Sequence, residues 1–213
     1  MPNPVPDDES ATGGRVWLGA TKQERQTIRR YAFLEAALDI IGETGTAGVS
    51  VRSLCRRAGL TDRYFYESFE SRDALVVQLF EQVAHDVYER VAAATRGLEE
   101  PEAWARAAVR VLVDVATEDP RKGKLLLVEP LSEPSLSLAA IASVPSLTKI
   151  LGLTALYRDA SKRQRAMTAI GLTGMIGGLF AAWLSDNLHV SADELVEHCV
   201  GMIVGSATYP TRT

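Results

Sequence analysis

The chain has 213 residues, of which 46% are hydrophobic and 23% charged, which is typical of a soluble protein with one core or a small domain joined to a larger one. Its net charge of −4 at pH 7 argues against a nucleic-acid-binding protein whose whole surface is basic. The two cysteines, Cys55 and Cys199, have no metal-like spacing, which argues against a disulfide framework or a zinc site. No apolar signal-peptide core follows Met1, so we expect a reducing, cytoplasmic location.

The first element expected in chain order is a helix that follows a flexible arm. Residues 1–20 hold several prolines and a Gly-Gly pair without periodic hydrophobic residues, a composition that predicts an unstructured arm. Thr21 can cap a helix that ends near Glu43, because Glu24 completes a capping box and hydrophobic residues recur at helical spacing. Gly45 is expected to stop it.

Two short helices joined by a glycine are expected next, forming a helix-turn-helix. Ser50 caps the first, residues 51–58, and Gly59 supplies the turn conformation that other residues resist. Thr61 is expected to cap the second helix, from Asp62 to about Phe69. In such a motif the second helix lies in the DNA major groove, with its first turn against the base edges.

The second of these helices carries side chains suited to DNA. Arg63 can donate two hydrogen bonds to guanine, Asp62 can accept from cytosine, and Tyr64 lies in the same first turn. Tyr66 and Ser68 are placed to touch phosphates, which fix register without reading sequence. A plain solvated helix is the alternative interpretation, and the density of aromatic residues argues against it.

The charge distribution supports the same segment. Residues 22–72 hold nine Lys and Arg against seven Asp and Glu, whereas the remainder of the chain is acidic. Arg72, near the start of the next helix, could reach a phosphate, as could backbone amides at that helix end.

The rest of the chain predicts a helical body. Ser71 can cap a long helix with an apolar stripe from Leu75 to Val91, long enough to link the N-terminal unit to the body. Five further helical stretches follow. They are residues 101–119, 121–131 (broken at Pro130), 132–157 (interrupted at Pro145), 160–187 and 190–207.

Residues 166–185 carry no charge and could span a bilayer by length. This is the only such stretch, it lies late in the chain, and it holds two threonines and four glycines, which favours a helix buried all round. Its small residues permit close approach of a second helix. We therefore expect no membrane segment and a four-helix dimer interface built from the last two helices of each chain.

The segment around the second short helix resembles the DNA-binding domain of the TetR family of bacterial transcriptional regulators. The residues that carry the resemblance are Tyr64, Phe65, Tyr66, Phe69, Ser71, Arg72, Asp73 and Leu75. The sequence departs from the usual family pattern at Ser68, where many members have histidine, and at Arg63–Tyr64, where small residues are common. The length of the chain and its helical remainder also suit the family.

The resemblance implies an all-α protein with a helix-turn-helix domain at residues 21–70, joined by a long helix to a ligand-binding and dimerisation domain at 71–213. It implies that Ser50 and Arg52 contact DNA, that Tyr66 and Arg72 contact phosphates, and that Asp62, Arg63 and Tyr64 read bases. The complete expected DNA-binding set is Ser50, Arg52, Thr61, Asp62, Arg63, Tyr64, Tyr66, Ser68 and Arg72.

The resemblance further implies a homodimeric repressor on a palindromic operator, released by a small ligand bound in the body. The apolar candidates to line that pocket are Trp104, Tyr157, Met175, Phe180 and Trp183, which favour a hydrophobic ligand, although core packing explains each of them as well. We expect no metal, cofactor or enzymatic activity, because neither a nucleophile–base pair nor a metal cluster stands out. The alternative function is a helix-turn-helix protein that acts through a protein partner.

Overall fold

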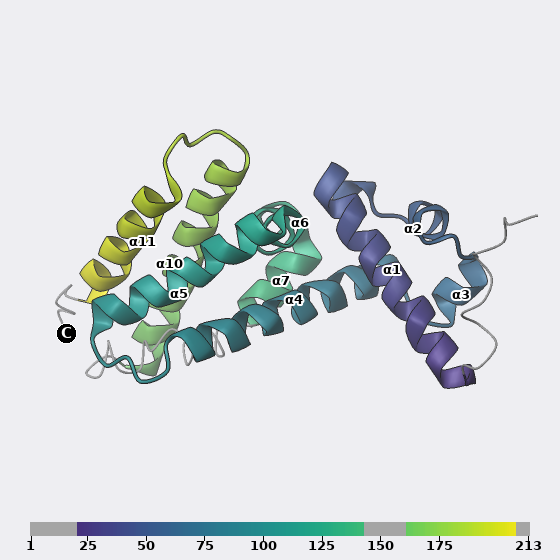
Figure 1. The fold of residues 1–213 in the computed structure, drawn as a ribbon, viewed down its shortest axis with the longest axis horizontal. Helices are drawn as coiled ribbons and strands as arrows, with labels where there is room; N and C mark the ends of the chain where they lie inside the picture. The colour runs from purple at the N-terminus through teal and green to yellow at the C-terminus, as the bar shows by residue number, and fades with distance from the viewer. Residues whose placement is uncertain (1–20, 143–160, 208–213) are drawn as a thin grey trace, which may run out of the picture.

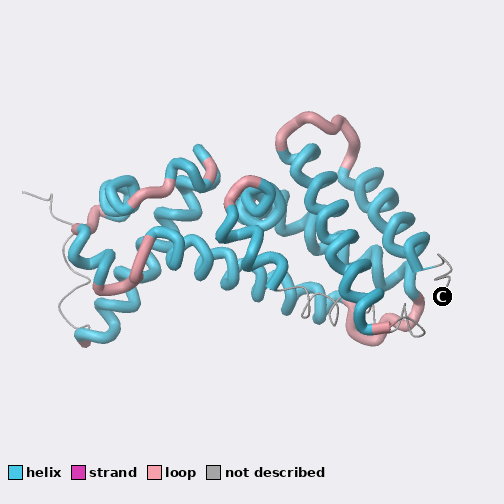
Figure 2. Tube along the Cα trace, turned by 180° about the vertical axis from the view of Figure 1, so that it is seen from behind, coloured by secondary structure: helices cyan, strands magenta, loops and turns pink. Residues whose placement is uncertain are grey.

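A computed structural model describes residues 21–142 and 161–207, and within these ranges the chain folds into helices and connecting loops without a strand (Figures 1 and 2). The molecule is elongated. At one end lie α1 (Lys22–Thr44), α2 (Val51–Ala58) and α3 (Asp62–Tyr66), and at the other lie α10 (Lys162–Leu184) and α11 (Ala192–Ala207) (Figure 1). Helix α4 (Arg72–Ala94) runs between the two ends. The all-α class and the arrangement of a helix-turn-helix followed by a helical body are thus confirmed.

The N-terminal helices begin and end at the residues that their caps dictate. In chain order they are α1 (Lys22–Thr44), the 3-10 turn η1 (Thr46–Gly48), α2 (Val51–Ala58) and α3 (Asp62–Tyr66). Thr21 and Glu24 form the expected capping box, and Ser50 forms one with Ser53. Gly45, with φ of 75°, ends α1 in a backbone conformation that favours glycine.

The turn between α2 and α3 has the expected left-handed glycine, since Gly59 has φ of 64°. Two details of α3 differ from expectation. Thr61 precedes the helix but its side chain makes no capping hydrogen bond, and the helix ends at Tyr66 rather than near Phe69. The residues after Tyr66 form a turn that keeps the amide of Phe69 bonded to the carbonyl of Phe65, which buries both rings before the chain enters α4.

The N-terminal core is aromatic. Phe33 of α1 meets Phe65 of α3 edge to face, with ring centroids 5.5 Å apart, and Phe69 joins the same cluster. Leu54 of α2 is fully buried beside them, and half-buried Cys55 packs against the cluster. These contacts fix α3 against α1, so the exposed face of α3 has a defined orientation.

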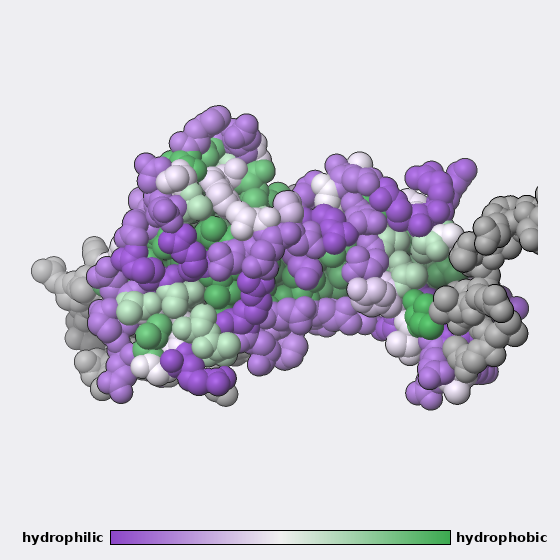
Figure 3. Space-filling model, viewed as in Figure 1, coloured by the Kyte–Doolittle hydropathy of each residue, from purple (hydrophilic) through white to green (hydrophobic). Residues whose placement is uncertain are grey.

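Helix α4 (Arg72–Ala94) continues the core into the body. Ser71 caps it by accepting a hydrogen bond from the amide of Ala74. The expected apolar stripe is buried over its whole length, from Leu75 to Val91. Its neighbour is α5 (Pro101–Glu118), and hydrophobic residues reach the surface in a band between the two helices (Figure 3).

The segment after α5 is more irregular than a single short helix. It consists of α6 (Pro120–Gly123), a π-helical turn η2 (Lys124–Val128), a 3-10 turn η3 (Glu129–Leu131) and α7 (Pro134–Ala142). Pro130 and Pro134 lack the amide that a continuous helix would need. This segment lies against α1 on one side and α10 on the other.

The last two described helices are α10 (Lys162–Leu184) and α11 (Ala192–Ala207). The expectation that α10 is buried all round is wrong for a single chain. Only Ala169, Leu172, Ile176 and Phe180 are buried, on one face, and Met167 is 63% exposed on the other. By length and composition α10 could also cross a membrane.

Candidate functional site

The tip of α3 presents polar and aromatic side chains to solvent. The Arg63 side chain is 83% exposed, and its Nε donates to Oε1 of Glu67 at 3.1 Å. Asp62 is exposed and accepts a hydrogen bond from the amide of Arg63 at 2.9 Å. Tyr66, expected to touch a phosphate, is 63% exposed. These three side chains form one accessible face.

Two other residues of the expected DNA-binding set lie further inward. The guanidinium of Arg29 stacks on the half-buried ring of Tyr64 at 4.3 Å, so Tyr64 packs against α1 instead of pointing away from the core. The hydroxyl of Ser68 donates to the Tyr64 carbonyl at 2.9 Å, which leaves only its lone pairs for other groups. Thr61 is exposed at the start of α3.

The start of α2 adds a basic surface beside this tip. Ser50 is exposed, but its hydroxyl is engaged in the capping box with Ser53. Arg52 and Arg56 are exposed and form no ion pair with any described residue. Arg57, in contrast, is bound to Glu43 of α1 at 2.8 Å and 2.5 Å. Arg52 and Arg56 are therefore the cations of α2 that remain available to an anionic partner.

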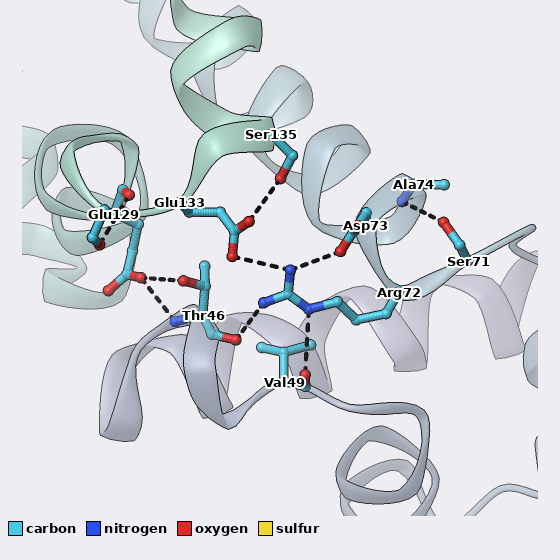
Figure 4. A network of polar contacts seen from close by, with 10 residues as sticks. Thr46, Val49, Ser71, Arg72, Asp73, Ala74, Glu129, Glu133 and Ser135 are labelled. Carbon is cyan, nitrogen blue, oxygen red and sulfur yellow. Dashed lines mark hydrogen bonds and ion pairs between the residues drawn. The ribbon is translucent and has the colours of Figure 1, made fainter.

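Arg72 is turned toward the interior of the protein (Figure 4). Its guanidinium donates to the carbonyls of Val49 (3.3 Å) and Thr46 (2.5 Å), and to the carboxylates of Asp73 (2.8 Å) and Glu133 (3.0 Å). Four of its five N–H donors are thus used inside the chain. The phosphate contact expected of Arg72 is not available to the side chain in this conformation.

A second buried carboxylate joins the same two parts of the molecule. Glu129 is only 6% exposed, and its Oε2 accepts from the amide of Thr46 at 2.8 Å and from the Thr46 hydroxyl at 2.6 Å. On the neighbouring face Arg121 pairs with Asp39 of α1 at 2.5 Å. We call the contacts of Glu129, Glu133 and Arg121 with the N-terminal helices the junction.

The body contains an apolar cavity of about 130 Å³ next to the junction segment. Helices α4, α5, α7 and α10 and the turn η2 line it. Its lining residues are Phe80, Ala84, Val87, Tyr88, Leu112, Leu126, Leu127, Ala140, Thr173, Ile176 and Gly177. Leu126 and Leu127 belong to η2, so the same short segment touches the cavity and, through the junction, the N-terminal helices.

None of the described residues predicted to line a ligand pocket lies in this wall. Phe180 is fully buried and packs edge to face on Trp183, and Trp104 is half-buried against the core of the body. Met175 lines a shallower hollow between α10 and α11. Tyr157 and the arm of residues 1–20 lie outside the described residues. The predicted aromatic residues on α5 and α10 therefore serve the core.

Sequence reasoning also missed the residues that position the site. Arg29 and Glu67 hold α3, while Glu129 and Glu133 hold the junction. Their partners lie between 35 and 83 positions away, and nothing in local spacing points to them. Burial raises the pKa of the Cys199 thiol to about 11, and burial with nearby Asp62 raises that of Cys55, so neither is an activated nucleophile. Within the described residues, no three His, Cys, Asp or Glu side chains are grouped as metal ligands.

An aromatic core holds the exposed helix α3 in place at one end of a helical body. This arrangement is typical of helix-turn-helix DNA-binding regulators. Residues 33–79 match the family model described as "Bacterial regulatory proteins, tetR family". Over these residues the chain is similar to the TetR family.

Individual relatives agree with this placement. The chain is 27% identical over 86 residues to "HTH-type transcriptional regulator BetI" of Rhizobium meliloti (strain 1021), a match that spans 40% of this chain and 42% of that relative. A TetR-like regulator from Rhodococcus sp. RHA1 superposes with a TM-score of 0.66 at 17% identity, covering 86% of this chain and 98% of that one. The regulator FadR of Bacillus subtilis, solved in complex with stearoyl-CoA, has a TM-score of 0.63 at 14% identity, covering 84% and 99%. At these identities the two structures show a shared fold.

Proposed function

We propose that the protein is a cytoplasmic, homodimeric transcriptional repressor that binds a palindromic operator and leaves it when a small hydrophobic ligand enters the body. The observation that carries this proposal is the accessible face of Arg52, Asp62, Arg63 and Tyr66 on a rigid helix-turn-helix. Base reading belongs to Asp62, Arg63 and Arg52, and phosphate contact to Tyr66. Tyr64 supports α3 from behind.

The uncovered face of α10 supports the dimer. Gly171, Gly174 and Gly178 are exposed, and a Cβ added at any of them would meet no atom of the described residues within 4 Å. Met167 and Ile170 add exposed apolar area on the same helix. A second copy packed there would bury this apolar surface, and a twofold axis would present two α3 helices to two half-sites.

The cavity and the junction support the ligand response. A ligand changes DNA affinity only if it binds one conformation of the body more tightly than the other. Residues 124–133 contact both the cavity and the N-terminal helices, so a shift of η2 on ligand binding would move Glu129 and Glu133 against Thr46 and Arg72. The Bacillus subtilis neighbour of the same fold was solved in complex with stearoyl-CoA, which supports a ligand-binding role for the body.

Operator binding by Arg52 is tested by substitution. Arg52→Ala should weaken binding by about 1–3 kcal/mol if the side chain reads a base. The measurement is a fluorescence anisotropy titration at fixed salt, with an operator selected from a random DNA library. Arg90→Ala is the matched control, because Arg90 is exposed on α4 and paired with Glu118, away from α2 and α3. Equal affinities for Arg52→Ala and the unsubstituted protein would contradict the assignment.

The role of the junction is tested separately with Glu133→Ala. Removing this carboxylate should leave ligand binding unchanged but reduce the ligand-induced loss of operator affinity, which in such systems is typically about 1–3 kcal/mol. Titrations of operator with and without saturating ligand give the coupling for each variant. The control is Glu99→Ala, an exposed position between α4 and α5. Unchanged coupling would remove Glu133 from the proposed pathway.

A further inference from the structure

The residues that line the apolar cavity restrict the chemical class of ligand that it can bind. The inference about that class rests on the proposed ligand response. Among the described residues that line it, none carries a charge. A charged molecule entering this space would lose its hydration without gaining an opposite charge, which is strongly unfavourable. The cavity therefore favours an uncharged ligand.

Among the described lining residues, two have polar side chains, Tyr88 and Thr173. The hydroxyl of Thr173 donates to the carbonyl of Ala169, one turn earlier in α10, at 2.8 Å. Its proton is therefore engaged, and its lone pairs are left to accept a hydrogen bond. A ligand that brings its own O–H donor matches this wall better than one that brings only acceptors.

The size of the cavity limits the ligand as well. Its volume of about 130 Å³ is close to that of apolar cavities of roughly 150 Å³ that stay dry and bind benzene. A long acyl chain or a fused-ring drug would extend beyond this space. Phe80, Leu127 and Ile176 offer flat and branched apolar surface for one ring.

We propose that the cavity binds an uncharged single-ring molecule carrying one hydroxyl group, with the hydroxyl donating to Oγ1 of Thr173. The chemical class is that of simple phenols. The ring occupies the space beside Gly177, where an added Cβ would meet only the carbonyl oxygen of Leu127, at 3.9 Å.

Isothermal titration calorimetry on the full-length protein, without DNA, tests the proposed class. Four probes share one ring and differ in one substituent: p-cresol, toluene, 4-methylbenzoate and 4-methylbenzylammonium. We expect p-cresol to bind about fivefold more tightly than toluene, the gain from one hydrogen bond, and both charged probes to bind at least about tenfold more weakly than p-cresol. Binding of either charged probe as tight as that of p-cresol, or no binding of p-cresol, would overturn the proposal.

Two variants test the placement of the ligand. Gly177→Leu should fill the cavity and weaken binding of both neutral probes by at least about tenfold, whereas Ala92→Leu, which adds the same side chain type on the exposed face of α4, should not. Thr173→Val keeps the shape and should abolish the preference for p-cresol over toluene. If that preference persists, Thr173 is not the acceptor.

Operator titrations with and without p-cresol, set beside the calorimetry, separate this inference from the repressor function. Circular dichroism of each variant confirms that it is folded before its affinity is compared. If p-cresol binds as expected and operator affinity does not change, the cavity assignment stands and the proposed ligand response fails.

Discussion

The carboxylate of Glu67 contacts the side chains of two arginines, Arg63 and Arg29. Its carboxylate accepts from Nε of Arg63 at 3.1 Å and lies 3.8 Å from a guanidinium nitrogen of Arg29. It therefore adds negative charge beside the surface proposed to face DNA phosphates, and it holds the exposed Arg63 along the helix. An acidic residue here lowers the affinity for DNA of any sequence.

Glu67→Gln should raise affinity for non-specific DNA and free Arg63 to reach a phosphate. Neutralising one more phosphate steepens the plot of log K against log salt by about 0.9. Anisotropy titrations on random-sequence duplex DNA from low to moderate salt measure both effects. Glu99→Gln removes a charge far from α3 and should change neither. An unaltered slope for Glu67→Gln would mean that Arg63 does not turn toward DNA.

At the residue scale, the direction in which each side chain of the candidate site points could not be predicted from the sequence. Tyr64 and Tyr66 lie two positions apart and look equivalent, yet Tyr64 is held under Arg29 and Tyr66 is exposed. Arg72 fits a phosphate-contacting position, but Glu133, 61 residues later, binds its guanidinium. Each outcome depends on a partner from a distant element.

At the scale of elements, the sequence was sufficient to predict the helix ends and turns that depend on neighbouring residues alone. The caps at Thr21, Ser50 and Ser71 and the left-handed Gly59 were predictable, because each acts within about four residues. The π-helical turn η2 was not, since its shape depends on packing between α1 and α10. Proline positions indicated a break in this segment without specifying its geometry.

Glu129 links two of these elements and should matter for stability. Glu129→Ala leaves the amide and hydroxyl of Thr46 buried without their acceptor, which costs about 1–3 kcal/mol. Urea unfolding followed by circular dichroism measures the loss. Glu99→Ala, at an exposed site, should shift the midpoint little. A stability equal to that of the unsubstituted protein would show that another group replaces the carboxylate.

On the scale of the whole molecule, the described part of a single chain leaves one apolar face of α10 exposed. The hydrophobic pattern of α10 predicted a helix that is buried on every side. In the single chain, however, α10 buries one face only. We propose that the other face is covered in the dimer, whose formation removes the exposed apolar side chains from water.

Gly174→Arg tests this packing. The added side chain projects into open space in a single chain, so folding should be retained, but it would block close approach of a second α10. Light scattering at micromolar concentration should then report a monomer, with unchanged helical content by circular dichroism. Ala92→Arg, exposed on α4, should remain dimeric. A dimer that persists in Gly174→Arg would place the interface elsewhere.

The π-helical turn η2 has a geometric consequence for the junction. The amide of Glu129 bonds to the carbonyl of Lys124, five positions back, where an α-helix would reach back four. This one additional residue sets the angle at which everything after η2 leaves the turn, including both Glu129 and Glu133. Loss of a single residue here would rotate the two carboxylates together by about 100° around the helix axis. Because Glu129 and Glu133 both follow η2, a change in the winding of this turn would displace both carboxylates together. The contacts with Thr46 and Arg72 would then be lost at the same time.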